Sequence, residues 1–202
     1  PWLSDEIGML DEETSRRMRD GLLATPWVRH VRVERVFPDR FRLHLSLRRP
    51  VISVLTADSE ALCLVDEAGI MLPWVDCDLP QLRLYREGGS PTMEVVPGQA
   101  SDEPRVRVAV GIAKEWNDQV APLVEQCPRL MEIDATNLGE RWIRGPEYPE
   151  VRVHLKRDDD QPVVFGYGHP VDSPLDRVPV TRKAEVLRKI LKEHAGLEEL
   201  VA

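Results

Sequence analysis

The strongest local pattern in the sequence is residues 41–48, FRLHLSLR. Apolar and polar side chains alternate through four repeats, and this period of two is typical of a β-strand with one buried face. Residues 27–36 precede it and place Val31 and Val33 on one face. Pro38-Asp39 lies between the two stretches and favours a turn. The sequence therefore predicts a β-hairpin with one apolar face.

A helix is expected immediately before this hairpin, over residues 4–25. Asp11 is a suitable N-cap, and Met18 and Leu22 lie four residues apart on one helical face. Pro26 ends the helix, because the residue before a proline is driven out of the α region. We expect this helix to cover the apolar face of the hairpin.

The remainder of the chain predicts a mixed sheet with two helices, at residues 105–126 and 181–194, with Lys183 on the solvent side of the second. Strands are expected at residues 51–55, 62–65, 70–72, 79–85, 130–133, 151–155 and 163–167. The fold class is therefore α+β, with a helix/β-hairpin domain at residues 1–56 and a mixed β-sheet domain with two helices at residues 57–202.

Composition and charge limit the function. The chain has 202 residues and a net charge of −8, which argues against a general nucleic-acid binder. No apolar run approaches the roughly 20 residues of a membrane span. The charge is uneven, since residues 29–49 hold seven Arg against Glu34 and Asp39, a local charge of +5. This stretch is either a solvated strand face or a surface for anionic lipid, an acidic partner or a polyanion.

The sequence contains no clear catalytic or metal-binding motif. Its five histidines are scattered over separate predicted elements, and no G-x-S-x-G motif is present. Cys63, Cys77 and Cys127 form no C-x-x-C pair, so we expect no zinc site. They are either three unpaired thiols or one disulfide and one thiol. We therefore expect no catalytic residues, no cofactor and no metal.

A hydrolase remains the enzymatic alternative. Its acids would come from Asp66, Asp134 and residues 158–160, which are three aspartates at a predicted hairpin tip. These acids would have to converge in a pocket with His154 or His169. The simpler interpretation of residues 158–160 is a solvated loop, because adjacent side chains on a turn splay apart.

Five motifs occur in order between residues 26 and 51 and carry a family resemblance. They are Pro26-Trp27-Val28, the strand residues Val31 and Val33, Phe37-Pro38, Arg42-Leu43-His44-Leu45 and Arg49-Pro50-Val51. Together they resemble the POTRA domain of the bacterial FtsQ/DivIB cell-division proteins. Further along, the start of that family's β domain is similar to Val65-Asp66, Gly69, Leu72-Pro73 and Leu79-Pro80. The specific part of the resemblance covers about residues 25–80, and the rest agrees in element order.

The resemblance implies a non-enzymatic scaffold of the septal division machinery, or divisome. It implies a POTRA-like domain at residues 1–56 and an FtsQ-type β domain at residues 57–202. It also implies a membrane helix upstream of Pro1, with the chain at the periplasmic face of the inner membrane. The implied partners are coiled-coil membrane proteins of the FtsB and FtsL types. Two family features are missing: a strand before the first helix and a final strand with a D-x-R motif.

The resemblance also implies where partners would bind. The first candidate surface is an exposed edge of the β domain, formed by Val163, Val164, Phe165 and Tyr167. The second is the basic hairpin, with Arg32, Arg42 and Arg49, where charge reversal would weaken a partner complex without unfolding the chain. An alternative is a POTRA-like module of a secretion or outer-membrane assembly apparatus, which would pass clients by strand addition.

Overall fold

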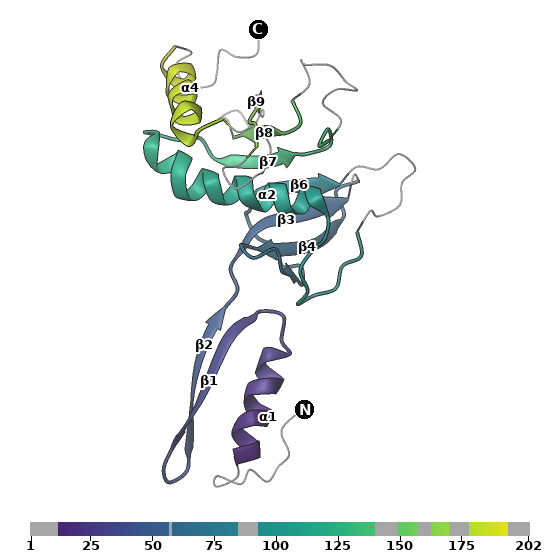
Figure 1. The fold of residues 1–202 in the computed structure, drawn as a ribbon, viewed down its shortest axis with the longest axis vertical. Helices are drawn as coiled ribbons and strands as arrows, with labels where there is room; N and C mark the ends of the chain where they lie inside the picture. The colour runs from purple at the N-terminus through teal and green to yellow at the C-terminus, as the bar shows by residue number, and fades with distance from the viewer. Residues whose placement is uncertain are drawn as a thin grey trace.

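The computed structural model describes residues 12–56, 58–84, 93–139, 149–156, 163–169 and 178–193. It is an α+β protein, as the sequence predicts, and its two units lie end to end (Figure 1). The smaller unit contains α1 (Glu12–Leu23), β1 (Val28–Val36) and β2 (Arg40–Leu47). The predicted N-cap Asp11 and residues 4–10 lie outside the described residues. No helix in the described ranges is long and apolar enough to cross a membrane.

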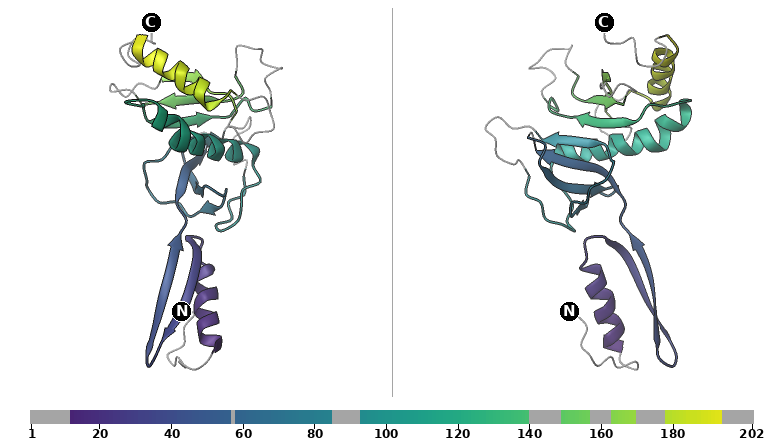
Figure 2. Two further views of the ribbon diagram at one scale, coloured as in Figure 1. Left: turned by 60° about the vertical axis from the view of Figure 1, so that its left-hand side comes forward. Right: turned by 180° about the vertical axis from the view of Figure 1, so that it is seen from behind.

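The smaller unit is an antiparallel hairpin with α1 beside it (Figure 2). Pairs such as Val31↔Leu45 and Val33↔Leu43 place the apolar side chains of both strands on one face. The helix packs against β1 and buries Met18 and Val31. The predicted hairpin is therefore confirmed.

The expected cover of the hairpin's apolar face is only half right. On β2, Leu43, Leu45 and Leu47 are 45%, 47% and 59% exposed, because α1 packs against β1 and leaves β2 uncovered. Phe37 is 85% exposed, since it lies in the turn between the strands. One helix is too narrow to bury both strands.

The larger unit is built on a seven-stranded sheet of order β5-β4-β3-β6-β7-β8-β9. Parallel pairing joins β3 to β6 and β6 to β7, and the other neighbours are antiparallel. The strands are β3 (Pro50–Thr56), β4 (Ala61–Asp66), β5 (Met71–Leu72), β6 (Gln81–Leu84), β7 (Leu130–Asp134), β8 (Arg152–Leu155) and β9 (Val163–Gly166). The helical segments are α2 (Pro104–Glu115), the π turn η1 (Trp116–Val120), the 3-10 turn η2 (Ala121–Leu123) and α4 (Val180–Glu193).

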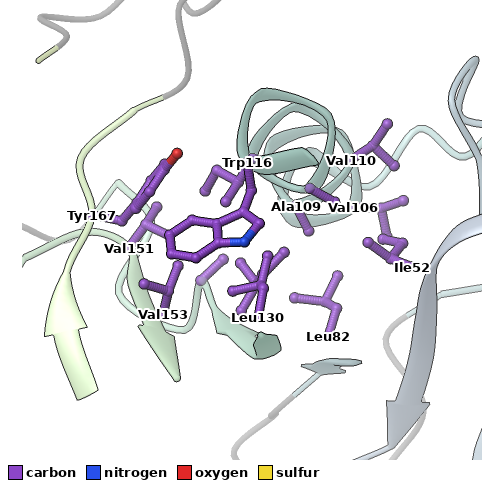
Figure 3. Close-up of a cluster of buried hydrophobic side chains, with 14 of the residues drawn as sticks. Ile52, Leu82, Val106, Ala109, Val110, Trp116, Leu130, Val151, Val153 and Tyr167 are labelled. Carbon is purple, nitrogen blue, oxygen red and sulfur yellow. The ribbon is translucent and has the colours of Figure 1, made fainter. Parts of the chain in front are cut away.

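The core lies between α2 and this sheet. Glu103 caps the helix by accepting a hydrogen bond from the Arg105 backbone N–H at 3.2 Å, and Pro104 occupies its first turn. Figure 3 shows Val106, Ala109 and Trp116 pointing toward the sheet. They meet buried strand residues that include Ile52, Leu82, Leu130 and Val153. Each large side chain buried here contributes roughly 1.5–3 kcal/mol.

The change from one sheet to the other falls at Arg48-Arg49. The segment β3 pairs with β4 and β6 of the larger sheet, although the sequence analysis assigned residues 50–56 to the first domain. Its side chains from Ile52 to Leu55 are all buried in the larger unit. The backbone hydrogen bonds of the small sheet end before Arg49, and those of the large sheet begin after it. The domain boundary expected after residue 56 is therefore about seven residues later than the boundary between the two sheets.

Asp66 joins the two units. Its side chain is 3% exposed, and Oδ1 accepts hydrogen bonds from the backbone N–H groups of Ala68 and Ile70, both at 2.9 Å. Its other oxygen accepts from Arg48 Nη1 at 3.0 Å. A second pair, Arg29 and Glu67 at 2.6 Å, lies beside it at the surface. The turn after β4 therefore holds the end of the hairpin.

Asp134 closes the turn after β7 in a similar way. Its Oδ1 accepts from the Thr136 backbone N–H at 2.9 Å, and Oδ2 accepts from Arg152 Nε at 3.0 Å. Burial favours the neutral carboxyl, but the hydrogen bonds and the charge of Arg152 outweigh it and lower the pKa of Asp134 below 3.8.

We predict that Asp134→Asn lowers the free energy of unfolding by about 1–2 kcal/mol at neutral pH. A carboxylate whose pKa is lowered by folding stabilises the protein above its unfolded pKa, and this stability is lost as the pH falls through the lower native pKa. The difference between wild type and variant should therefore shrink below about pH 3.8. Urea unfolding at a series of pH values measures it.

Asp118→Asn is the matched control, because Asp118 is exposed on η1. Its effect on stability should stay within about 0.5 kcal/mol at every pH. If the loss of unfolding free energy in Asp134→Asn did not change with pH, the lowered pKa of Asp134 would be contradicted.

Candidate interaction surfaces

The two edges of the seven-stranded sheet differ. At one edge β5 is covered, because the Met71 N–H donates to Gln99 O and the Gly98 N–H donates to Met71 O, both at 2.8 Å. Ile70 and Ala100 form a further bridge there. At the other edge β9 pairs only with β8 within the described ranges. An edge strand of this kind presents unpaired backbone groups to a partner.

The hydrogen-bond pattern shows which backbone groups of β9 point outward. The Tyr167 N–H donates to Val151 O at 3.1 Å, next to the Arg152↔Gly166 pair. Residues in an antiparallel pair alternate between hydrogen-bonded and non-hydrogen-bonded positions. Val164, three residues before Tyr167, therefore directs its N–H and C=O away from β8. Its side chain is 45% exposed.

The first set of predicted interaction residues is only partly at this edge. Val163, Val164 and Phe165 lie on β9. The side chains of Val163 and Phe165 lie outside the described residues. Tyr167 was expected on the exposed edge, but its side chain is 3% exposed, so that expectation is wrong. The chain turns inward after Gly166, and the phenol packs under α2 and α4.

Tyr167 belongs to a buried polar cluster around Glu115. The Tyr167 hydroxyl donates to Glu115 Oε1 at 2.8 Å, and Lys183 Nζ donates to the same oxygen at 2.5 Å. Lys183 Nζ also donates to His169 O at 3.0 Å and lies 4.0 Å from the Tyr167 ring centre. The cluster therefore ties α4 and the segment after β9 to the end of α2.

Burial dominates the electrostatics of this cluster. It lowers the pKa of Lys183, although the hydrogen bond to Glu115 and the charge of Glu115 act in the opposite direction. The pKa of Tyr167 is raised, first by burial and then by the Glu115 charge. His169 adds a hydrogen bond, with Nε2 at 2.7 Å from Glu150 Oε2. The contacts among Glu115, Tyr167 and Lys183 therefore hold the segment that follows β9 in place.

No sequence pattern singled out Glu115, and Lys183 was expected on the solvent side of the last helix. The Lys183 side chain is 6% exposed, so that expectation is wrong. The available signal was spacing, because Lys183 lies four residues before the buried Leu187. Lysine side chains are rarely buried, so the residue type pointed to the solvent side. Its acidic partner, Glu115, lies 68 residues away in the sequence.

We predict that Lys183→Met destabilises the protein by about 3 kcal/mol, since it leaves Glu115 buried without its cation. The double variant Lys183→Met with Glu115→Leu should recover most of that loss, because it removes both charges. Urea unfolding measures both.

Arg182→Met is the control, because the Arg182 side chain is 67% exposed. It should change stability by less than about 0.5 kcal/mol. Equal stabilities for Lys183→Met and Arg182→Met would show that the buried pair contributes nothing.

The second set of predicted interaction residues is separated. Arg32 and Arg42 lie on one face of the hairpin, through the pairs Arg32↔His44 and Glu34↔Arg42. Arg42 is 3.7 Å from Glu34, which also contacts His44 at 3.3 Å. Arg49 is exposed in the link between the units. The three arginines therefore do not form one surface.

The residues of the hydrolase hypothesis also lie apart. Asp66 pairs with Arg48, Asp134 with Arg152 and His169 with Glu150. His154 lies on β8 opposite Glu132, and residues 158–160 lie outside the described residues. Within the described ranges, no three His, Cys, Asp or Glu side chains gather as metal ligands would.

All three cysteines are free. Cys63 is buried, Cys127 is half-buried and Cys77 is exposed. Burial raises the pKa of both Cys63 and Cys127 to about 11. The alternative with three unpaired thiols is therefore the one that the structure contains.

No protein-family model matches this chain, and no curated protein matches it. The likeness to the FtsQ/DivIB division proteins therefore depends on the motifs of residues 25–80.

Proposed function

We propose that this chain is a non-enzymatic interaction module that binds an extended segment of a partner protein along β9. The observation that carries the proposal is the contrast between the two sheet edges. The β5 edge is already paired with residues 98–100, whereas β9 offers the outward N–H and C=O of Val164. Main-chain pairing at a sheet edge gives affinity without special residue types.

The buried cluster supports this proposal through preorganisation. An added strand gains more affinity when the edge that receives it is already rigid, because less conformational entropy is lost on binding. Glu115 and Lys183 anchor the segment that follows β9, and the Gly166 backbone is packed close to Pro149. A Cβ atom at Gly166 would lie 3.1 Å from Pro149 Cγ, so a side chain here would require the Pro149 ring to shift.

We further propose that the module belongs to a membrane-anchored division protein of the FtsQ type, on the extracytoplasmic side of the membrane. The motifs of residues 25–80 and the order of the two units support this. The partners on β9 would be FtsB- or FtsL-type coiled-coil membrane proteins. A POTRA-like module of a secretion or outer-membrane assembly apparatus is the competing proposal, and the identity of the partners distinguishes the two.

The experiment is affinity capture of the full-length protein from its own membranes, with co-purified proteins quantified by mass spectrometry. Val164→Pro removes the outward N–H and keeps the ladder to β8, since proline is tolerated at such edge positions. We expect it to lower partner recovery about fivefold, from the loss of one hydrogen bond worth about 1 kcal/mol.

Val164→Thr is the matched control, because it changes the side chain and retains the N–H. Equal recovery with the proline and threonine variants would exclude the β9 edge. Small single-span coiled-coil proteins together with a septal wall synthase would support the division role. A β-barrel or lipoprotein set would support the transport role, and the absence of membrane partners would overturn both.

A further inference from the structure

The smaller unit exposes a row of apolar side chains. Leu43, Leu45 and Leu47 form an apolar strip along β2, on the face of the hairpin that also holds Val31. Phe37 lies in the turn between β1 and β2 and is 85% exposed. Figure 1 shows this turn at the end of the molecule that lies away from the larger unit. Neighbouring exposed apolar side chains of this kind mark an interaction surface.

Exposed arginines accompany the apolar strip. The alternation of side chains along β2 directs Arg40 and Arg42 to the face opposite the leucines. Their side chains are 82% and 61% exposed, and each lies 3.7 Å from one carboxylate, Asp39 for Arg40 and Glu34 for Arg42. Exposed ion pairs contribute little to stability, so both arginines can exchange these carboxylates for another anion. A surface that approaches β2 from the side away from β1 therefore meets leucines and arginines together.

The charge of the chain is divided between the two units. Residues 12–49 hold ten Arg and five acidic residues, a formal charge of +5. Residues 50–202 hold 17 basic and 27 acidic residues, a formal charge of −10. An anionic surface therefore attracts the smaller unit and repels the larger one. This separation gives the molecule a preferred orientation at such a surface.

We propose that the β2 side of the smaller unit docks onto an anionic phospholipid membrane. The apolar strip and Phe37 enter the boundary between the headgroups and the acyl chains, where buried apolar area strengthens binding. Arg40 and Arg42 reach the lipid phosphates, because long arginine side chains can keep their charged ends in the polar layer. The larger unit then points away from the membrane, because its negative charge is repelled.

Lipid fits this surface better than a protein does. Two copies of this chain that packed strip against strip would bring two units of charge +5 together, which disfavours a dimer. A stable protein interface buries roughly 800 Å² on each partner around a closely packed core. The apolar strip is a single strand wide, and a fluid lipid layer adapts to a narrow surface. The strip and β9 lie in different units, so this proposal does not depend on the proposed function of β9.

The test is flotation of the 202-residue chain with lipid vesicles, with the bound fraction measured over a range of lipid concentrations. One set of vesicles contains equal parts of phosphatidylglycerol and phosphatidylcholine, and the other contains phosphatidylcholine alone. We expect binding to the anionic vesicles to be roughly tenfold stronger, because arginines near an anionic surface are attracted to it. This advantage should shrink as salt is raised, since salt screens the attraction.

The apolar strip is tested with Leu43→Thr and Leu45→Thr together. Threonine favours strands and both leucines are exposed, so the thermal midpoint of the double variant should stay close to that of wild type. Its binding to the anionic vesicles should fall roughly tenfold, because less apolar area enters the membrane. Phe37→Ser is a second, independent variant in the turn, and it should weaken binding about fivefold.

The charge is tested with Arg40→Glu, which should weaken binding to the anionic vesicles about fivefold. Arg182→Glu is the matched control, because Arg182 is exposed on α4 and its reversal changes the net charge by the same amount. It should bind within about twofold of wild type, since α4 belongs to the unit that points away from the membrane and salt screens distant charges.

Four results would overturn the proposal. Equal binding to both sets of vesicles, or no binding to either, would exclude an anionic membrane as the ligand. Unchanged binding of the folded leucine and Phe37 variants would exclude the strip. Equal losses with Arg40→Glu and Arg182→Glu would show that only net charge matters. A dimer in analytical ultracentrifugation that the leucine double variant abolishes would show that a second copy covers the strip.

Discussion

The packing of α2 against the seven-stranded sheet is the constraint on which the larger unit depends. β6 and β7 are parallel neighbours, and parallel strands require a crossover connection, which here contains α2. The helix buries one face of the sheet, and its last residue, Glu115, is buried with it. A buried carboxylate needs hydrogen bonds and a cation. Tyr167 and Lys183 supply them, so the placement of β9 and α4 follows from the helix that covers the sheet.

Asp66 has the corresponding role between the two units. It closes the turn after β4 with two backbone hydrogen bonds and uses its other oxygen for Arg48, at the end of the hairpin. The chain that links the two units is short, consisting of Arg48-Arg49. The Asp66–Arg48 and Arg29–Glu67 ion pairs therefore limit how the units can move relative to each other. As a result, β1 and β9 lie in different units of an elongated molecule (Figure 1).

The two units differ in the surfaces that they present. In the larger unit, the cluster around Glu115 holds the segment that follows β9, whereas arginines gather between α1 and β1 in the smaller unit. Leu43, Leu45 and Leu47 add an exposed apolar strip on β2, within the same small unit.

The sequence by itself determined the elements and the fold class. Alternation over residues 41–48, the turn at Pro38-Asp39 and the spacing of apolar residues in α2 are local signals, and local signals decide where a strand or helix forms. Only the tertiary structure decided which surfaces are open. Tyr167 and Lys183 are buried because both donate hydrogen bonds to the buried carboxylate of Glu115, which lies 52 residues before Tyr167 and 68 residues before Lys183 in the sequence. Contacts between residues far apart in the chain leave no periodic pattern, so no local reading of the sequence could find them.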